Sequence, residues 1–369
     1  MKNNNGGKLV GVKFLNEESF DKNCYLNLLK KELEKSSLSS DIRVLLKEVF
    51  KSIETDEFIL NSQEKNFISR NPESLADYII YRYKFRIYPE KSILTDFPVY
   101  LLIEPTSICN LRCKMCFQTD EFFSQKENMG FIDLAFYKSL IDQAVEGNAK
   151  ALTMASRGEP LLHKDFDKML EYAKGKFFEL KVNTNCMLLD EQKAHMLLKS
   201  DVTDLVFSID SSDKEQYEGL RVGASFDKVL KNIQTFNAIR EKDYPGSKIT
   251  TRISGVKCSD EQDMKKFVDF WSEHVDAVAY VDCVNRKDSY NNDESFANYR
   301  CKTLWNRMYV WWNGVCNPCD FDYKSNLELG NAKEKTLREI WNGSKMQELR
   351  KNHVNGKRAE HHPCNVCEL

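Results

Sequence analysis

Three closely spaced cysteines are the first residues in this chain whose type and spacing point to chemistry. Cys109, Cys113 and Cys116 follow the pattern Cys-x3-Cys-x2-Cys. A structural zinc ion takes four ligands, yet the next histidine is His163 and the next cysteine is Cys186. A 4Fe–4S cluster has four corners, so three thiolates leave one iron open for a substrate or cofactor. The spacing favours an iron–sulfur centre, while zinc with a distant fourth ligand stays an alternative.

A second group of cysteines lies in the last part of the chain: Cys301, Cys316, Cys319, Cys364 and Cys367. They surround Asn313-Gly314, a strong hairpin signal between two apolar runs, and the helix start signalled by Thr336 and Glu339. A unit this small with little apolar content gains stability from a bound metal. We therefore expect a second metal centre here.

The composition narrows the classes of protein to which the chain can belong. It has 369 residues, which predicts two or three domains. Lys and Arg number 54 against 56 Asp and Glu, for a net charge of −2, which argues against binding nucleic acid by neutralising phosphates. No apolar run is long enough for a membrane span, and the N-terminus lacks a signal-peptide pattern. We expect a cytoplasmic protein whose thiols are reduced.

From residue 98 onward, short apolar runs alternate with amphipathic stretches. This alternation predicts a parallel sheet with right-handed helical crossovers. Six units are too few for an eight-stranded barrel, so a partial barrel or an open doubly wound sheet remains. The expected strands are 99–104, 151–156, 179–185, 204–210, 248–254 and 275–282, and the expected helices are 133–146, 166–175, 190–199, 226–241 and 260–274.

The residues with chemical potential follow the carboxyl ends of these strands, where sites in such folds collect. In chain order they are the Cys109–Cys116 segment, Arg157-Gly158-Glu159-Pro160, Cys186, Ser208 with Asp210, Cys258 and Cys283. The spacing therefore predicts that all of them share one rim.

Residues 1–95 carry helical patterns at 24–36, 41–53 and 74–88. No recognisable chemistry lies there, so we expect a helical extension that caps the molecule or recruits a substrate. The predicted domains are this extension, a core at 96–290 and a small C-terminal domain at 291–369.

The segment CNLRCKMC after the first strand resembles the signature of the radical S-adenosylmethionine (SAM) superfamily. RGEP at 157–160, SID at 208–210 and the stretch 219–233 extend the resemblance over 98–285. It implies an α/β fold, a partial (β/α)6 barrel. It also implies a 4Fe–4S cluster on Cys109, Cys113 and Cys116, with SAM chelating the open iron.

The same resemblance implies SAM-binding roles for four residues. Glu159 would accept hydrogen bonds from the methionyl ammonium group, and Gly158 would let the backbone approach closely. Ser208 and Arg221 would bind the carboxylate or ribose of SAM. Arg157 departs from the family pattern, which often has glycine there.

The C-terminal part resembles the SPASM/Twitch domains of the superfamily, which hold auxiliary iron–sulfur clusters. Four ligands, Cys301, Cys319, Cys364 and Cys367, would saturate a single auxiliary 4Fe–4S cluster. Cys316 is then surplus, as a half-buried hairpin residue or an alternative ligand. A zinc ion on the same four cysteines is the main alternative.

These features predict a radical SAM oxidoreductase that dehydrogenates a small polyol, sugar or cyclitol. A one-electron donor such as flavodoxin or ferredoxin is the expected partner, with no nucleic acid and no membrane. The alternatives are a peptide-modifying radical SAM enzyme and a zinc-stapled binding protein without catalysis. Cys186, Cys258 or Cys283 would return hydrogen to a substrate radical in an epimerisation, and Arg286 or Lys257 would serve as the base in an oxidation.

Overall fold

The computed structural model describes residues 10–14, 22–36, 38–283, 290 and 299–367. The chain divides into two compact units. One comprises Phe14–Thr95, and the other comprises Met1–Lys13 together with Asp96–Leu369.

The Phe14–Thr95 unit is helical where it is described, with α1 (Lys22–Glu34), α2 (Ser40–Glu54), α3 (Ser62–Arg70) and α4 (Leu75–Lys91). Asn61 and Glu64 form a capping box at the start of α3, so two backbone N–H groups without helical partners are satisfied. The fully buried Glu64 carboxylate also pairs with Arg82 and Arg86 of α4. The Glu64 side chain thus both caps α3 and forms the buried ion pairs with α4.

The larger unit is built on parallel strands that follow one another in sequence order across the sheet. They are β2 (Tyr100–Ile103), β4 (Ala151–Met154), β5 (Glu179–Thr184), β6 (Asp204–Ser208), β8 (Thr250–Lys257) and β9 (Ala277–Asp282). Each pairs in parallel with the next. The predicted α/β class and the six (β/α) units are confirmed.

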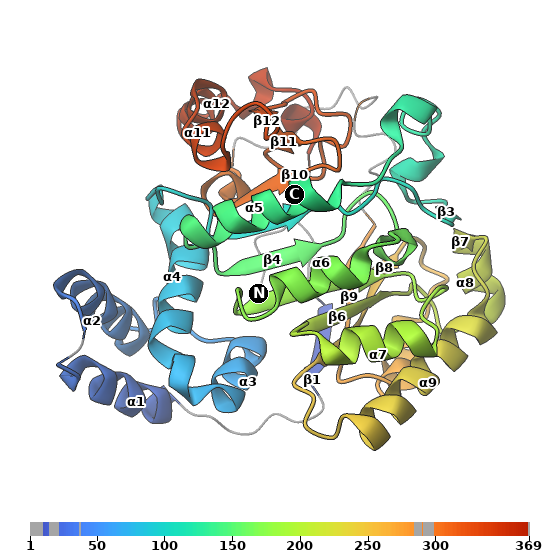
Figure 1. The fold of residues 1–369 in the computed structure, drawn as a ribbon, viewed down its shortest axis with the longest axis horizontal. Coiled ribbons are helices and arrows are strands. Elements are labelled where there is room, and N and C mark those ends of the chain that lie inside the picture. The colour runs from blue at the N-terminus through green and yellow to red at the C-terminus, as the bar shows by residue number, and fades with distance from the viewer. Residues whose placement is uncertain (1–9, 15–21, 37, 284–289, 291–298, 368–369) are drawn as a thin grey trace. The chain divides into compact units, whose positions relative to one another are not determined.

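Helices cover the outer face of this sheet, and Figure 1 shows α5, α6 and α7 side by side over it. The crossover helices are α5 (Leu134–Glu146), α6 (Phe166–Ala173), α7 (Glu191–Lys199), α9 (Phe226–Asp243) and α10 (Met264–Trp271). Their apolar sides pack with alternate strand residues such as Leu152, Val182 and Ile253 into one core. Because side chains alternate along a strand, the intervening residues face the inner side of the sheet.

The C-terminal segment is joined to the same sheet, which the sequence pattern did not predict. Strand β10 (Arg307–Val310) pairs in parallel with β2, and β11 (Val315–Asn317) and β12 (Gly330–Asn331) extend it antiparallel. The expected hairpin forms at Asn313-Gly314, where Gly314 has a φ of 94° that favours glycine. Helices α11 (Leu337–Trp341) and α12 (Ser344–Val354) follow, and the expected capping box of Thr336 and Glu339 opens α11.

Strand β1 (Val10–Phe14) lies beside β9 at the other edge of the sheet. The predicted helical extension therefore begins with a strand where it is described. A separate small sheet pairs β3 (Arg112–Cys113) with β7 (Arg221–Val222), just after α8 (Lys214–Leu220). This pairing, which was not predicted, brings Arg221 beside Cys113.

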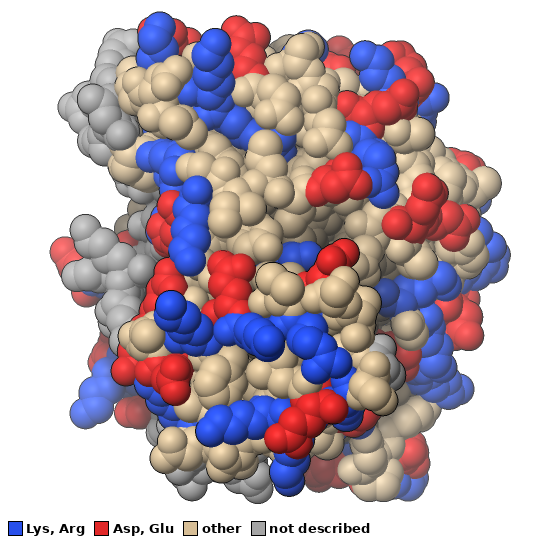
Figure 2. All heavy atoms as spheres, turned by 90° about the vertical axis from the view of Figure 1, so that its left-hand side faces the viewer, with Lys and Arg blue, Asp and Glu red and all other residues tan. Residues whose placement is uncertain are grey.

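On the face that Figure 2 shows, basic and acidic side chains are interspersed. This mixture agrees with the near-neutral net charge of −2. Among the described helices, none is both long and apolar enough to cross a membrane.

Candidate functional site

The segment with the first three cysteines leaves the carboxyl end of β2 and is fastened to the residues that precede α5. Thr106 Oγ1 donates to the Gly130 carbonyl at 2.7 Å, and Ser107 Oγ donates to the Asn128 carbonyl at 2.8 Å. These hydroxyl-to-carbonyl hydrogen bonds tie the two ends of the cysteine loop together.

The three thiols lie close enough to influence one another's ionisation. Burial raises the pKa of Cys109 to about 12, and the neighbouring Cys113 and Cys116 contribute to the rise. Burial also raises the pKa of Cys113. Metal ligation requires the thiolate. The positive charge of a bound cluster would therefore have to offset the free-energy cost of deprotonating these buried thiols.

Within the described ranges, no three His, Cys, Asp or Glu side chains converge on one ion position. In a 4Fe–4S cluster each cysteine binds a different iron, so the ligands surround a volume instead of a point. Cys109, Cys113 and Cys116 would hold such a cluster, and this assignment stays a prediction.

Gly158 is packed against the cysteine loop. A Cβ atom at this position would lie 2.3 Å from the Thr106 carbonyl and 2.5 Å from that of Ile108. The Glu159 N–H donates to the Ile108 carbonyl at 2.9 Å. A larger residue at 158 would push the loop after β4 away from the cysteine loop. Gly158 therefore allows these two loops to pack closely.

The Glu159 carboxylate is buried and already accepts three hydrogen bonds from the chain. They come from Thr184 Oγ1 at 2.8 Å, the Asn185 N–H at 2.8 Å and the Leu161 N–H at 3.1 Å. Burial raises its pKa, and these donors oppose the rise. The carboxylate is thus fixed between the ends of β4 and β5, and its predicted role toward the methionyl ammonium stays a proposal.

Arg221 contacts one of the predicted cluster ligands. Its Nη1 lies 3.9 Å from Cys113 Sγ, while its Nε and Nη2 pair with the buried Asp210 carboxylate at 2.7 and 3.0 Å. Asp210 also accepts from the Val256 N–H at 2.9 Å. Asp210 therefore orients Arg221. The sequence pattern placed Asp210 at the rim but did not indicate this positioning role.

Polar atoms without partners lie near the rim, as a site for a polar ligand requires. Ser156 Oγ and Asn183 Oδ1 are buried and have no hydrogen-bond partner among the described residues. Ser208, half-buried at the end of β6, lies in register with Ser254 of β8. Unpaired buried polar atoms are costly, so these side chains fit a site that SAM and a polar substrate would fill.

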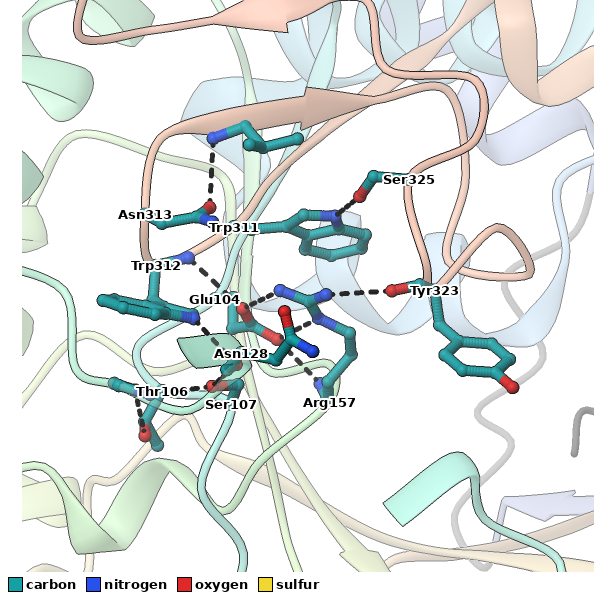
Figure 3. A network of polar contacts seen from close by, with 12 residues as sticks. Glu104, Thr106, Ser107, Asn128, Arg157, Trp311, Trp312, Asn313, Tyr323 and Ser325 are labelled. Atoms are coloured by element: carbon teal, nitrogen blue, oxygen red, sulfur yellow. Dashed lines mark hydrogen bonds and ion pairs between the residues drawn. The ribbon is translucent and has the colours of Figure 1, made fainter. Parts of the chain in front are cut away.

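Arg157 links this rim to the C-terminal hairpin through a buried ion pair (Figure 3). Its Nε and Nη2 each lie 2.7 Å from a carboxylate oxygen of Glu104, and its Nη1 donates to the Tyr323 carbonyl at 2.9 Å. The Trp312 N–H donates to Glu104 at 3.2 Å, and the guanidinium lies 4.2 Å from the centre of the Trp311 ring. Glu104 was not identified from the sequence, although it ends the predicted strand 99–104, at the edge where site residues collect.

The four predicted auxiliary ligands also come together. Cys319 lies within electrostatic range of Cys301, Cys364 and Cys367, and burial together with these neighbours raises its pKa. Buried Arg358 donates to the carbonyls of Cys364 and Cys367 at 2.8 and 2.5 Å and so holds their turn. Four neighbouring thiols are the donor set that a thiolate-bound cluster would need.

Cys316 and Cys186 have no exposed surface and pack in the main apolar core. The Cys316 thiol contacts the Gly314 carbonyl at 3.7 Å, and the Cys186 thiol contacts the Thr184 carbonyl at 3.9 Å. Burial raises the pKa of both thiols. As placed, each side chain packs as a small apolar group.

Cys258 and Cys283 meet at the ends of β8 and β9. Cys283 lies close enough to raise the pKa of the Cys258 thiol, and the Cys283 N–H donates to the Lys257 carbonyl at 2.8 Å. Both side chains are half-buried. Lys257 is committed to an exposed ion pair with Asp260 at 2.8 Å, and the predicted base Arg286 lies outside the described residues.

Two family models match the chain. Residues 103–270 match the radical SAM superfamily, and residues 301–368 match an iron–sulfur cluster-binding domain, SPASM. These matches imply 4Fe–4S clusters and SAM as cofactors. The two ranges contain all seven cysteines that were predicted as cluster ligands.

Curated relatives cover only part of the chain. The mycofactocin maturase MftC of Mycobacterium tuberculosis is 27% identical over 143 residues, 39% of this chain and 35% of that protein. A tungsten-containing aldehyde ferredoxin oxidoreductase cofactor-modifying protein of Pyrococcus furiosus is 33% identical over 112 residues, 30% of each chain. The matched regions thus span about a third of these relatives' own length.

Solved structures share the fold at low sequence identity. Streptococcus suis SuiB bound to S-adenosylmethionine is 19% identical with a TM-score of 0.55, and the match covers 91% of this chain and 89% of SuiB. BtrN in complex with AdoMet and 2-DOIA is 21% identical with a TM-score of 0.50, over 73% of this chain and 92% of BtrN.

Proposed function

We propose that the chain is a radical SAM enzyme that oxidises a small polyol, sugar or cyclitol, because residues 103–270 match the radical SAM superfamily and residues 301–368 match the SPASM domain. When bound, SAM and its cluster supply a 5′-deoxyadenosyl radical that removes a hydrogen atom, and the auxiliary cluster supplies a one-electron acceptor. The oxidation is completed when the substrate radical loses a proton and an electron to become a carbonyl.

The observation that carries this proposal is the packing of Cys319, a predicted auxiliary ligand, against residues on the inner face of the sheet. Tyr309 and Trp311 of the β10 hairpin pack with Leu102 of β2, and Cys319 packs against this small cluster. Leu102 and Tyr309 are register partners whose strand neighbours belong to the outer core, so alternation places both on the inner face, and Cys319 packs against that face. An electron acceptor at Cys319 is therefore close to any substrate bound there.

The chain's own residues would position the reactants. Glu159 and the Asp210–Arg221 pair lie at the rim where SAM is expected, and the cysteine loop is fixed by its bonds to Asn128 and Gly130. A one-electron donor such as flavodoxin or ferredoxin would reduce the first cluster.

A second candidate function is supported by the neighbouring thiols of Cys258 and Cys283. A thiol at the rim can return a hydrogen atom to a substrate radical, which inverts a stereocentre instead of oxidising it. This chemistry would suit a sugar epimerase or a peptide-modifying enzyme; SuiB has been solved with its precursor peptide SuiA.

The test is an anaerobic assay of the reconstituted protein with SAM, a reductant and a panel of polyols, sugars and peptides in deuterated water. We expect 5′-deoxyadenosine to rise with an oxidisable polyol or sugar and a product that lacks two hydrogen atoms. Solvent deuterium in a product of otherwise unchanged composition would select the epimerase. Absence of SAM cleavage would refute both.

Matched variants separate the two outcomes. Cys319→Ser should retain SAM cleavage and lose the oxidised product, whereas Cys258→Ser should leave oxidation intact and abolish deuterium incorporation. Cys24→Ser, on the exposed thiol of α1, should behave like the unchanged protein.

A further inference from the structure

Two basic side chains, Lys181 on β5 and Arg252 on β8, face the inner side of the sheet. Their strand neighbours Leu180, Val182 and Ile253 belong to the apolar core beneath the outer helices. Alternation along the strands therefore directs Lys181 and Arg252 to the opposite side. Both are half-buried.

Neither cation has a hydrogen bond or ion pair with any other described residue, and Arg252 Nε is closed off from solvent without an acceptor. Two buried arginines of the same unit do pair with carboxylates: Arg157 with Glu104, and Arg221 with Asp210. A guanidinium carries five N–H donors that match carboxylate and phosphate oxygens. Among the residues that the structure describes, the Arg252 guanidinium thus has no acceptor.

Charges of both signs surround the two cations. The cations Arg252 and Arg307 lower the pKa of Lys181, and the carboxylates Asp204 and Glu179 raise it. The Asp204 carboxylate already accepts from Thr203 Oγ1 at 2.9 Å. Two neighbouring like charges out of bulk water repel each other, and an anion bound between them would offset that repulsion.

The pair also lies at a suitable depth below the rim. Lys181 precedes Asn185 by four residues, and the Asn185 N–H donates to Glu159. At about 3.3 Å per residue, the two positions are about 13 Å apart along the strand. A substrate the size of a sugar, anchored at Lys181, would extend toward the expected SAM site.

We infer that Lys181 and Arg252 form an anion subsite that binds a carboxylate or phosphate group of the substrate. The inference rests on the proposed function and narrows its substrate class to a sugar acid or a phosphorylated polyol.

The first test measures binding, with no turnover. Reconstituted protein containing SAM is titrated with inorganic phosphate and with malonate in a calorimeter. We expect at least one of them to bind, and Lys181→Met and Arg252→Met each to weaken binding tenfold or more. Lys231→Met, on the exposed side of α9, is the matched control and should bind like the unchanged protein.

Equal binding in the unchanged protein and both inner variants, or no binding of either anion, would overturn the inference. The conservative variants Lys181→Arg and Arg252→Lys should retain measurable binding, which separates charge from shape. Circular dichroism of every variant checks that the fold persists.

The second test uses three related sugars: glucose, glucuronate and glucose 6-phosphate. Formation of 5′-deoxyadenosine above background with one anionic sugar, lost in Lys181→Met, supports the subsite and identifies carboxylate or phosphate as the group bound. Stimulation by glucose alone would overturn the subsite and leave the proposed oxidation standing. Failure to cleave SAM under any condition would instead refute the proposed function, while the calorimetric result would still decide the subsite.

Discussion

At the scale of single residues, the ionisation of Lys181 should make the affinity of the proposed subsite for anions depend on pH. Burial, followed by the charge of Arg252, lowers its pKa to about 8 from the ordinary 10.5. The groups that face it are Arg252, Arg307, Asp204 and Glu179. Below pH 8 the ammonium is charged and attracts anions, and above pH 8 it becomes neutral.

We therefore predict that sulfate, whose charge is constant over this range, binds about tenfold more weakly at pH 9 than at pH 7. Calorimetric titration at each pH measures the effect. Lys181→Arg, which stays charged, should show a flat profile. A flat profile in the unchanged protein would contradict the prediction.

The same residue affects stability with a definite sign. Since its pKa is lower in the folded chain, the unfolded chain binds more protons between pH 8 and 10.5, and stability rises with pH across that window. Lys181→Met removes the buried charge, so its thermal midpoint should exceed that of the unchanged protein at pH 7. The difference should shrink as the pH approaches 10.

Glu159 gives a second prediction at this scale. Its carboxylate accepts from Leu161, Thr184 and Asn185, and a glutamine would turn an NH2 group toward one of these donors. We expect Glu159→Gln to cost about 1–3 kcal/mol of stability and to raise the KM for SAM. Urea unfolding and SAM-cleavage kinetics measure the two effects, and Glu146→Gln at the exposed end of α5 should change neither.

At the scale of elements, the Arg157–Glu104 pair connects β2, the loop after β4 and the C-terminal hairpin. Its side chains are 7% and 0% exposed. Removing one partner leaves a buried charge without compensation, so we expect Arg157→Met to cost about 3–5 kcal/mol. A fall in the urea midpoint of the reconstituted protein measures this cost.

The double variant Arg157→Met with Glu104→Gln should recover part of the loss, because it no longer buries an unpaired carboxylate. Lys214→Met, which breaks an exposed ion pair with Asp227, is the control and should unfold with the unchanged protein. If Arg157→Met unfolds with that control, the pair does not join the elements as described.

The elements themselves were predictable where a local pattern defines them. Apolar runs such as 179–185 and amphipathic stretches such as 226–241 predicted β5 and α9 to within a few residues, because burial on one or both faces leaves a period in the sequence. The parallel pairing of β10 with β2 was not predicted. Its partner lies some 200 residues away along the chain, and no local period records that distance.

At the scale of the whole molecule, two cysteine groups predict two separable clusters. The reconstituted protein should hold about eight irons per chain. Cys113→Ser should lower the content to about four and abolish SAM cleavage, while the double variant Cys301→Ser with Cys364→Ser should lower it to about four and retain cleavage. Iron and sulfide analysis with the cleavage assay measures both, and two zinc ions per chain would contradict the assignment.

The sequence by itself determined the α/β fold class and predicted the cluster ligands. Cysteine spacing and the βα alternation are local properties, and the family matches at 103–270 and 301–368 agree with both. Only the tertiary structure decided which side chains meet: Arg221 with Cys113, Arg157 with Glu104, and Lys181 with Arg252. Each of these meetings joins segments far apart in sequence. Their energies depend on burial and on the other charges nearby, which exist only once the chain has folded.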